Sequence, residues 1–91
     1  MLIALDYDNT VTTDPELWKN FVVMALRRGH RVAIVTMRFP IESDDIDPWI
    51  KATLPILFTC RKAKKPWLEK QGIMPDIWID DTPEWILTDS K

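Results

Sequence analysis

The sequence has little of several features that would each indicate a particular class of protein. Cys60 is the only cysteine, so the chain can build neither a disulfide framework nor a cysteine-based zinc site. No apolar run approaches the roughly 20 residues of a membrane span or the core of a secretion signal. We therefore expect a protein of the reducing cytoplasm that has no membrane partner.

An excess of positive charge is also missing. The chain has 12 Lys and Arg against 14 Asp and Glu, and this net charge of −2 gives no bulk electrostatic reason to bind nucleic acid. Nucleic acid is therefore a candidate only as a substrate. With 91 residues the chain is too short to divide between two hydrophobic cores, so residues 1–91 are expected to form one domain.

Hydrophobic patterning predicts strands that alternate with helices. Four short apolar runs are typical of buried strands, at residues 2–5, 31–37, 56–59 and 76–79. Helices are expected at about 15–28, at 48–50 and at 66–71, and a last one opens at Pro83. This alternation predicts a three-layer α/β fold, in which helices cover both faces of a parallel sheet.

Acidic residues follow the first and the last predicted strand. Asp6 and Asp8 are two apart, so in an extended chain their side chains project from the same face. Asp80 and Asp81 close the last strand in the same manner. If the two strands are neighbours, the carboxylates converge and cannot all stay ionised unless a proton or a cation neutralises them, and oxygen-only ligands favour Mg²⁺.

Two further groups stand where chemistry is expected in a parallel sheet. Thr36 lies near the end of the second strand, and the basic run 61–65 precedes the third helix. Carboxylates, a divalent cation, a hydroxyl and an ammonium group are the parts needed to hold and transfer a phosphoryl group. The expected substrate is therefore a phosphorylated compound.

These residues carry a resemblance to a known family. The segment 6–12 (DYDNTVT) resembles the first motif of the haloacid dehalogenase (HAD) superfamily, and Thr36 is similar to its second. A lysine in residues 62–65 corresponds to the third motif and residues 79–81 (IDD) to the fourth, all in the family's order. The resemblance implies a Rossmann-like fold with about four parallel strands and no cap domain, because segment 9–14 and the segment after Thr59 are too short for one.

The resemblance also implies an activity, a Mg²⁺-dependent phosphomonoester hydrolase. Asp6 would be the nucleophile that forms an aspartyl-phosphate, and Asp8 the general acid and then the general base. Mg²⁺ would be held by Asp6, the backbone carbonyl of Asp8, Asp80 and Asp81. Thr36 would donate a hydrogen bond to the phosphoryl oxygens.

Two positions depart from the family pattern or leave a choice. Asn9 stands where the family usually has glycine, and asparagine tolerates the left-handed backbone that the turn needs. For the phosphate-site lysine, Lys65 is favoured over Lys64 and Lys62, because it directly precedes Pro66, as a lysine often does in this superfamily.

The uncapped site leaves several outcomes open. It would admit a bulky substrate, such as a phosphorylated polymer end or a phosphoprotein, or a second subunit would cover it. A catalytically silent HAD-like binding module is one alternative function. A receiver-like phosphoacceptor domain is another, but a receiver takes its phosphate at the end of the third strand, where this chain has Thr59 and Cys60.

Overall fold

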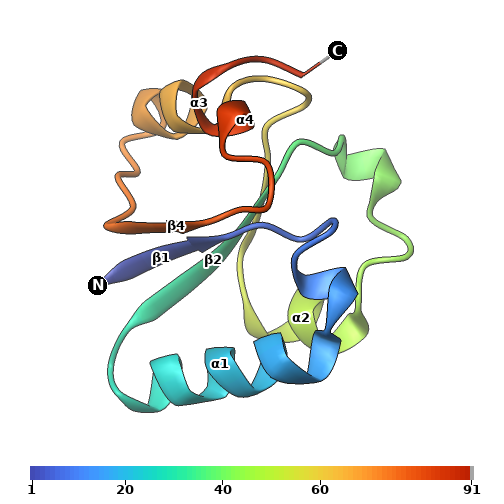
Figure 1. Ribbon diagram of the computed structural model, residues 1–91, viewed down its shortest axis with the longest axis vertical. Coiled ribbons are helices and arrows are strands. Elements are labelled where there is room, and N and C mark those ends of the chain that lie inside the picture. The colour runs from blue at the N-terminus through green and yellow to red at the C-terminus, as the bar shows by residue number, and fades with distance from the viewer. Residues whose placement is uncertain (91) are drawn as a thin grey trace.

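Four short parallel strands form a single sheet in the computed structural model, which describes residues 1–90 (Figure 1). The strands are β1 (Leu2–Leu5), β2 (Arg31–Thr36), β3 (Ile56–Phe58) and β4 (Ile77–Ile79). Their order in the sheet is β3-β2-β1-β4, and every neighbouring pair is parallel. The predicted parallel sheet is confirmed, and the first and last strands lie side by side.

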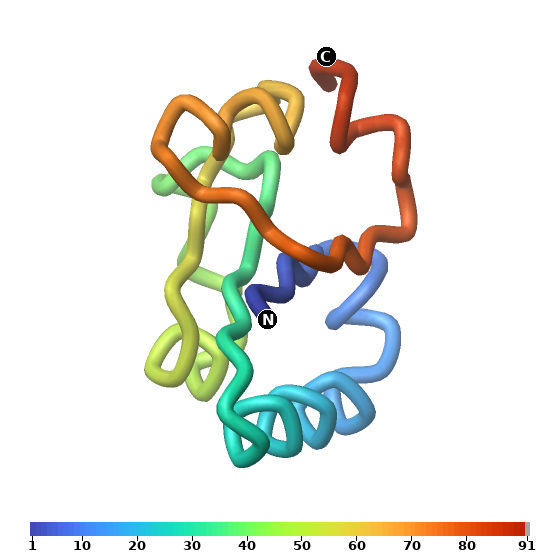
Figure 2. The backbone as a smooth tube through the Cα atoms, turned by 90° about the vertical axis from the view of Figure 1, so that its left-hand side faces the viewer, coloured from blue at the N-terminus to red at the C-terminus, as the bar shows by residue number. Residues whose placement is uncertain are grey.

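Helices cover both faces of this sheet. They are α1 (Pro15–Arg27), α2 (Pro48–Thr53), α3 (Lys64–Lys70) and α4 (Glu84–Leu87), with short 3₁₀ turns η1 (Val11–Thr13) and η2 (Pro40–Glu42). Figure 2 shows α1 at one end of the molecule and α3 at the other, with the strands between them. The three layers match the expected fold class, and the segment between β1 and α1 holds only η1, so no cap domain stands there.

Side chains that alternate between the two faces of the sheet form the two halves of the hydrophobic core, one on each face. Successive side chains of a strand point to opposite faces, so Leu5 and Ile34 pack with α1 and α2, whereas Ala4 and Val35 pack with Leu68 of α3. All five side chains are buried. Because both faces are covered, the buried positions between the strand ends are apolar, which is the pattern that identified the strands in the sequence.

The long helix α1 forms where its end signals predict it. The Asp14 carboxylate accepts a hydrogen bond from the Leu17 N–H at 3.2 Å, and Pro15 occupies the first helical position. Gly29 follows the helix with a φ of 83°, a left-handed conformation that glycine adopts at low cost. The helix therefore ends at a defined position, and the chain turns at Gly29 toward β2.

Helix α3 begins earlier than the sequence indicates. It starts at Lys64 rather than at Pro66, so the proline is the third helical residue. The first N–H groups of a helix have no partner within the helix, so a proline costs no hydrogen bond at this position. The two-residue difference places Lys64 in the first turn of α3, directly beside the sheet.

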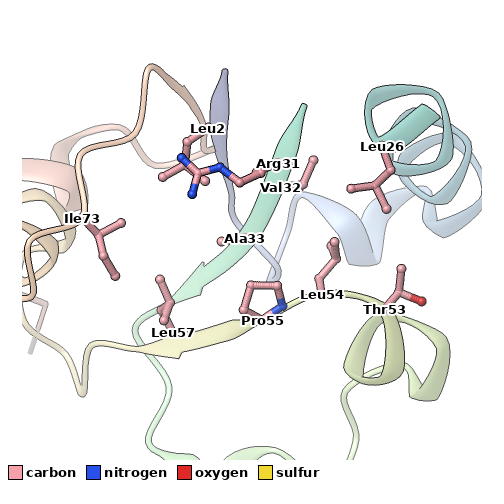
Figure 3. A pocket seen from close by; sticks show the side chains of 10 residues that line it. All are labelled: Leu2, Leu26, Arg31, Val32, Ala33, Thr53, Leu54, Pro55, Leu57 and Ile73. Carbon is pink, nitrogen blue, oxygen red and sulfur yellow. The ribbon is translucent and has the colours of Figure 1, made fainter. Parts of the chain in front are cut away.

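An apolar cavity of about 360 Å³ opens at the amino ends of the strands (Figure 3). Aliphatic side chains of β1, α1, β2 and β3, together with Leu54, Pro55 and Ile73, form most of its wall, and Arg31 and Thr53 supply the polar groups. None of the described residues that line it carries a carboxylate. Among residues 1–90, no helix has the length and apolar character needed to cross a bilayer.

Candidate functional site

The pairing of β1 with β4 brings two acidic segments together at the carboxyl edge of the sheet. Leu5 is in register with Ile79, and the Asp6 N–H extends the ladder by donating to the Ile79 carbonyl at 2.9 Å. Asp6 and Asp80 therefore leave neighbouring strands at the same level. The sequence predicted this convergence on the condition that the strands are neighbours, and that condition is met.

Three of the four predicted carboxylates form one cluster. One oxygen each of Asp6, Asp80 and Asp81 lies within 4.8 Å of the others. Asp6 is buried, the Asp80 side chain is only 3% exposed, and Asp81 is open to solvent. Asp6 and Asp80 thus form the buried part of the cluster, and Asp81 leaves it accessible to a ligand from solvent.

The lysine beside this cluster is Lys64, and the choice of Lys65 is corrected. The Lys64 Nζ donates to Asp6 Oδ1 at 2.8 Å and to Asp80 Oδ2 at 2.5 Å, and the residue is only 2% exposed. Lys65 and Lys62 are exposed. Because α3 starts at Lys64, successive residues rotate away from the sheet, and the side chain directly before the proline points to solvent.

Burial dominates the electrostatics of Asp6. It raises the pKa of Asp6 to about 7, although the ammonium group of Lys64 acts in the opposite direction. The hydrogen-bonded contact with Asp6 lowers the pKa of the more exposed Asp81. Nearby positive charge, such as the Lys64 ammonium group, therefore favours the ionised form of Asp6 against the effect of burial.

A hydroxyl that sequence reasoning missed links the two acidic segments. The Thr10 Oγ1 lies 3.0 Å from Asp6 Oδ2 and 3.2 Å from Asp81 Oδ1. Thr10 reaches them because Asn9 turns the chain with a φ of 60°, the left-handed conformation expected for that position. The position of Thr10, four residues after Asp6 in the quoted motif, is the signal that could have identified it.

Thr36 lies at the end of β2, beside β1. Its side chain is 1% exposed, and its Oγ1 accepts a hydrogen bond from the Arg38 N–H at 3.2 Å. Thr36 and Asp6 line the same cleft. The hydroxyl therefore acts as a hydrogen-bond acceptor in the structure.

Asp8 stands apart from the three clustered carboxylates. Its two oxygens accept hydrogen bonds from Arg38, Oδ2 from Nε at 2.9 Å and Oδ1 from Nη2 at 2.6 Å. Arg38 is itself held by the Glu42 carbonyl and Asp45, and its guanidinium lies 5.4 Å from the ring centre of Tyr7. Arg38 therefore fixes the Asp8 carboxylate.

Asp6 and Asp81 of the cluster open into a cleft of about 320 Å³ at the carboxyl edge of the sheet, and Asp80 is linked to it through Lys64. Its walls include the predicted residues Asp6, Asp8, Thr36 and Asp81, together with Lys64, Arg38, Arg61 and Trp85. Arg61 is paired with Glu42 at 3.0 Å and so contributes a compensated charge. Trp85 lines this cleft, whereas Trp67 packs against the core on α3.

The donor set of the cluster fits a hard divalent cation. Three carboxyl groups face one ammonium group, so when all three are ionised their charge exceeds that of Lys64 by two. All the candidate ligand atoms are oxygens, which Mg²⁺ prefers, and Asp81 leaves the cluster accessible from solvent. The carboxylate of Asp8 is outside this set because Arg38 binds it.

Comparisons with protein-family models, with curated proteins and with solved structures find no match to this chain.

Proposed function

We propose that this protein is a Mg²⁺-dependent phosphomonoester hydrolase of the HAD type. The observation that carries the proposal is the convergence of Asp6, Asp80, Asp81 and Lys64 in one cluster, of which Asp6, Asp81 and Lys64 line an accessible cleft. Such an arrangement combines a nucleophile with positive and cation-binding groups, as phosphoryl transfer requires. A position in the cytoplasm is part of the proposal and is based on the single cysteine.

Asp6 is the nucleophile in this proposal. Its oxygen attacks phosphorus, the bond from phosphorus to the leaving oxygen breaks, and an aspartyl-phosphate forms. Lys64 donates to Asp6 Oδ1, so its charge supports the ionised carboxylate and lies next to the incoming phosphoryl group. Thr36 donates a hydrogen bond from its hydroxyl to a phosphoryl oxygen.

Asp8 is the general acid and then the general base in this proposal. It protonates the leaving oxygen in the first step. In the second step it takes a proton from the water that attacks phosphorus, while the bond from phosphorus to the Asp6 oxygen breaks and phosphate is released. Arg38 holds its carboxylate in one orientation through two hydrogen bonds, which supports a defined proton-transfer geometry.

Asp6, Asp80 and Asp81 would hold the Mg²⁺ ion. When bound, the ion supplies charge neutralisation for the carboxylates and polarises the phosphoryl oxygens. The absence of a cap between β1 and α1 leaves the cleft open, so the proposed substrate can be a bulky phosphorylated polymer or protein, or a second subunit can cover the cleft.

The receiver-like alternative is disfavoured by the position of β3. That strand lies at the far edge of the sheet from β4 and is followed by Thr59 and Cys60, so no carboxylate stands at its end to accept a phosphate. A silent binding module keeps the same cluster without turnover, and only an activity measurement separates it from the enzyme.

The test is hydrolysis of 4-nitrophenyl phosphate with and without Mg²⁺. We expect turnover that requires Mg²⁺ and is lost in Asp6→Asn, with Asp44→Asn, a change of an exposed loop carboxylate, as the matched control. Absence of turnover, or turnover that Asp6→Asn leaves near the wild-type rate, would contradict the proposal.

A further inference from the structure

Trp85 is an exposed tryptophan, whereas most of the other tryptophans pack against the hydrophobic core. Of the five tryptophans, Trp18, Trp67 and Trp78 pack against the two halves of the core. Trp85 is 40% exposed, and the remaining Trp49 is 36% exposed on α2. The exposed part of the Trp85 side chain is not used in packing, so it has area left for another contact.

The backbone holds Trp85 against the cleft. The Ala63 N–H donates to the Asp89 carboxylate at 2.6 Å, and the Ser90 N–H donates to the Arg61 carbonyl at 2.8 Å. These bonds tie the segment after α4 to the turn that leads into α3, and α4 packs against α3. Figure 1 shows α4 beside α3, so Trp85 belongs to the folded body of the protein.

The cleft therefore has two chemically different parts. Asp6, Lys64 and Thr36 are buried polar groups, and Trp85 is the large aromatic side chain among the residues that line the cleft. A ligand whose phosphoryl group reaches the buried polar groups can place a planar group on the indole. Stacking of this kind is worth about 1–3 kcal/mol for a nucleobase on an aromatic side chain.

We propose that Trp85 is a specificity-determining residue, and that the site prefers phosphoryl compounds that carry a planar aromatic group. This inference rests on the proposed function for the phosphoryl end of the ligand. The aromatic group can be an aryl ring joined directly to the phosphate or a nucleobase joined through a ribose, and both would stack on the same indole.

Binding without turnover gives the sharpest test. We would measure the dissociation constants of phenylphosphonate and methylphosphonate by calorimetry in the presence of Mg²⁺, and those of adenosine 5′-monophosphate and ribose 5-phosphate on Asp6→Asn to prevent hydrolysis. In at least one pair we expect the aromatic member to bind more tightly by at least about fivefold, the lower end of the stacking range. The pair that shows the preference identifies the source of the ring.

The variants separate stacking from other effects. Trp85→Ala should reduce the aromatic preference to about onefold, Trp85→Phe should retain most of it, and Trp49→Ala should leave it at the wild-type value. Equal affinities within both pairs, or a preference that survives Trp85→Ala, would overturn the inference. An aromatic preference in a protein that hydrolyses no ester would contradict the proposed function and leave the role of Trp85 standing.

Discussion

At the scale of single residues, Lys64 is a buried lysine whose charge needs compensation within the protein. It is an ammonium group with 2% exposure, and two carboxylates compensate its charge. A buried ion pair is costly to break from one side, because the remaining charge loses its partner without regaining water. Lys64 is thus both a functional candidate and a structural requirement of the site.

The two neighbouring lysines give a direct comparison. We expect Lys64→Met to lower the free energy of unfolding by about 3 kcal/mol, because Asp6 and Asp80 lose their shared partner. Lys65→Met removes an exposed charge and should change stability by less than about 0.5 kcal/mol. Urea denaturation of both variants checks this, and equal effects would show that Lys64 is not the buried partner.

Asp6 gives a prediction about pH in the metal-free protein. Its pKa in the fold is about 7, above the value of 3.8 for an ordinary aspartate, so the folded state holds the proton more tightly than the unfolded chain. The stabilisation is complete below the unfolded pKa and is lost as pH rises through the folded pKa. We expect a decline of up to about 1.4 kcal/mol per pH unit between those two values.

The variant Asp6→Asn isolates this effect. Denaturation in urea with EDTA at several values between about pH 5 and pH 7 should show wild-type stability falling relative to the variant as pH rises. The carboxylates with lowered pKa titrate at lower pH, so they do not contribute to the difference. Parallel curves for the two proteins would refute the raised pKa of Asp6.

At the scale of elements, short helices depend on their caps. Asp47 Oδ1 accepts hydrogen bonds from the N–H groups of Trp49 and Ile50 at the start of α2, and Oδ2 pairs with Lys19 of α1 at 2.6 Å. Asp47→Ala should therefore cost about 1 kcal/mol of unfolding free energy in a denaturant titration. Asp44→Ala, in the same loop but exposed, is the control, and an equal loss there would argue against capping as the cause.

Local patterns predicted most elements, and the errors arise where an element boundary decides the outcome. The strands were predicted because burial on both faces leaves an unbroken apolar run, and α1 because Asp14, Pro15 and Gly29 mark its ends. The start of α3 was wrong because a proline is equally compatible with any position in the first turn. That ambiguity, together with the family pattern of a lysine directly before a proline, led to the choice of Lys65 over Lys64.

Contacts between distant segments were beyond sequence reasoning. The order of strands places Asp6 beside Asp80, and the sequence could state this only as a condition. The pairing of Arg38 with Asp8 depends on how the loop after β2 folds back, because Asp45 and the Glu42 carbonyl fix the guanidinium. No local periodicity encodes such a contact.

At the scale of the whole molecule, cation binding should couple to folding. The cluster exists only when β1 and β4 are paired, so a cation that binds it stabilises the folded state alone. At a Mg²⁺ concentration about a hundredfold above its dissociation constant, we expect a gain of about 2.7 kcal/mol. For a domain of this size that corresponds to a rise in melting temperature of about 10 °C or more.

Thermal unfolding with increasing Mg²⁺ measures this gain, and Asp80→Asn should reduce it while the exposed Asp44→Asn should not. A melting temperature that does not respond to millimolar Mg²⁺, or that responds equally in Asp80→Asn, would show that the cluster is not the binding site.

The most direct test of the central claim is a crystal structure of the protein with Mg²⁺ and beryllium fluoride, a mimic of a phosphoryl group on aspartate. Our account predicts beryllium bonded to a carboxylate oxygen of Asp6, Mg²⁺ held beside it by Asp6 and Asp80 or Asp81, and fluorine atoms within hydrogen-bond reach of Lys64 and Thr36. Beryllium fluoride bound elsewhere, or a cluster that stays free of both groups at saturating concentrations, would contradict it.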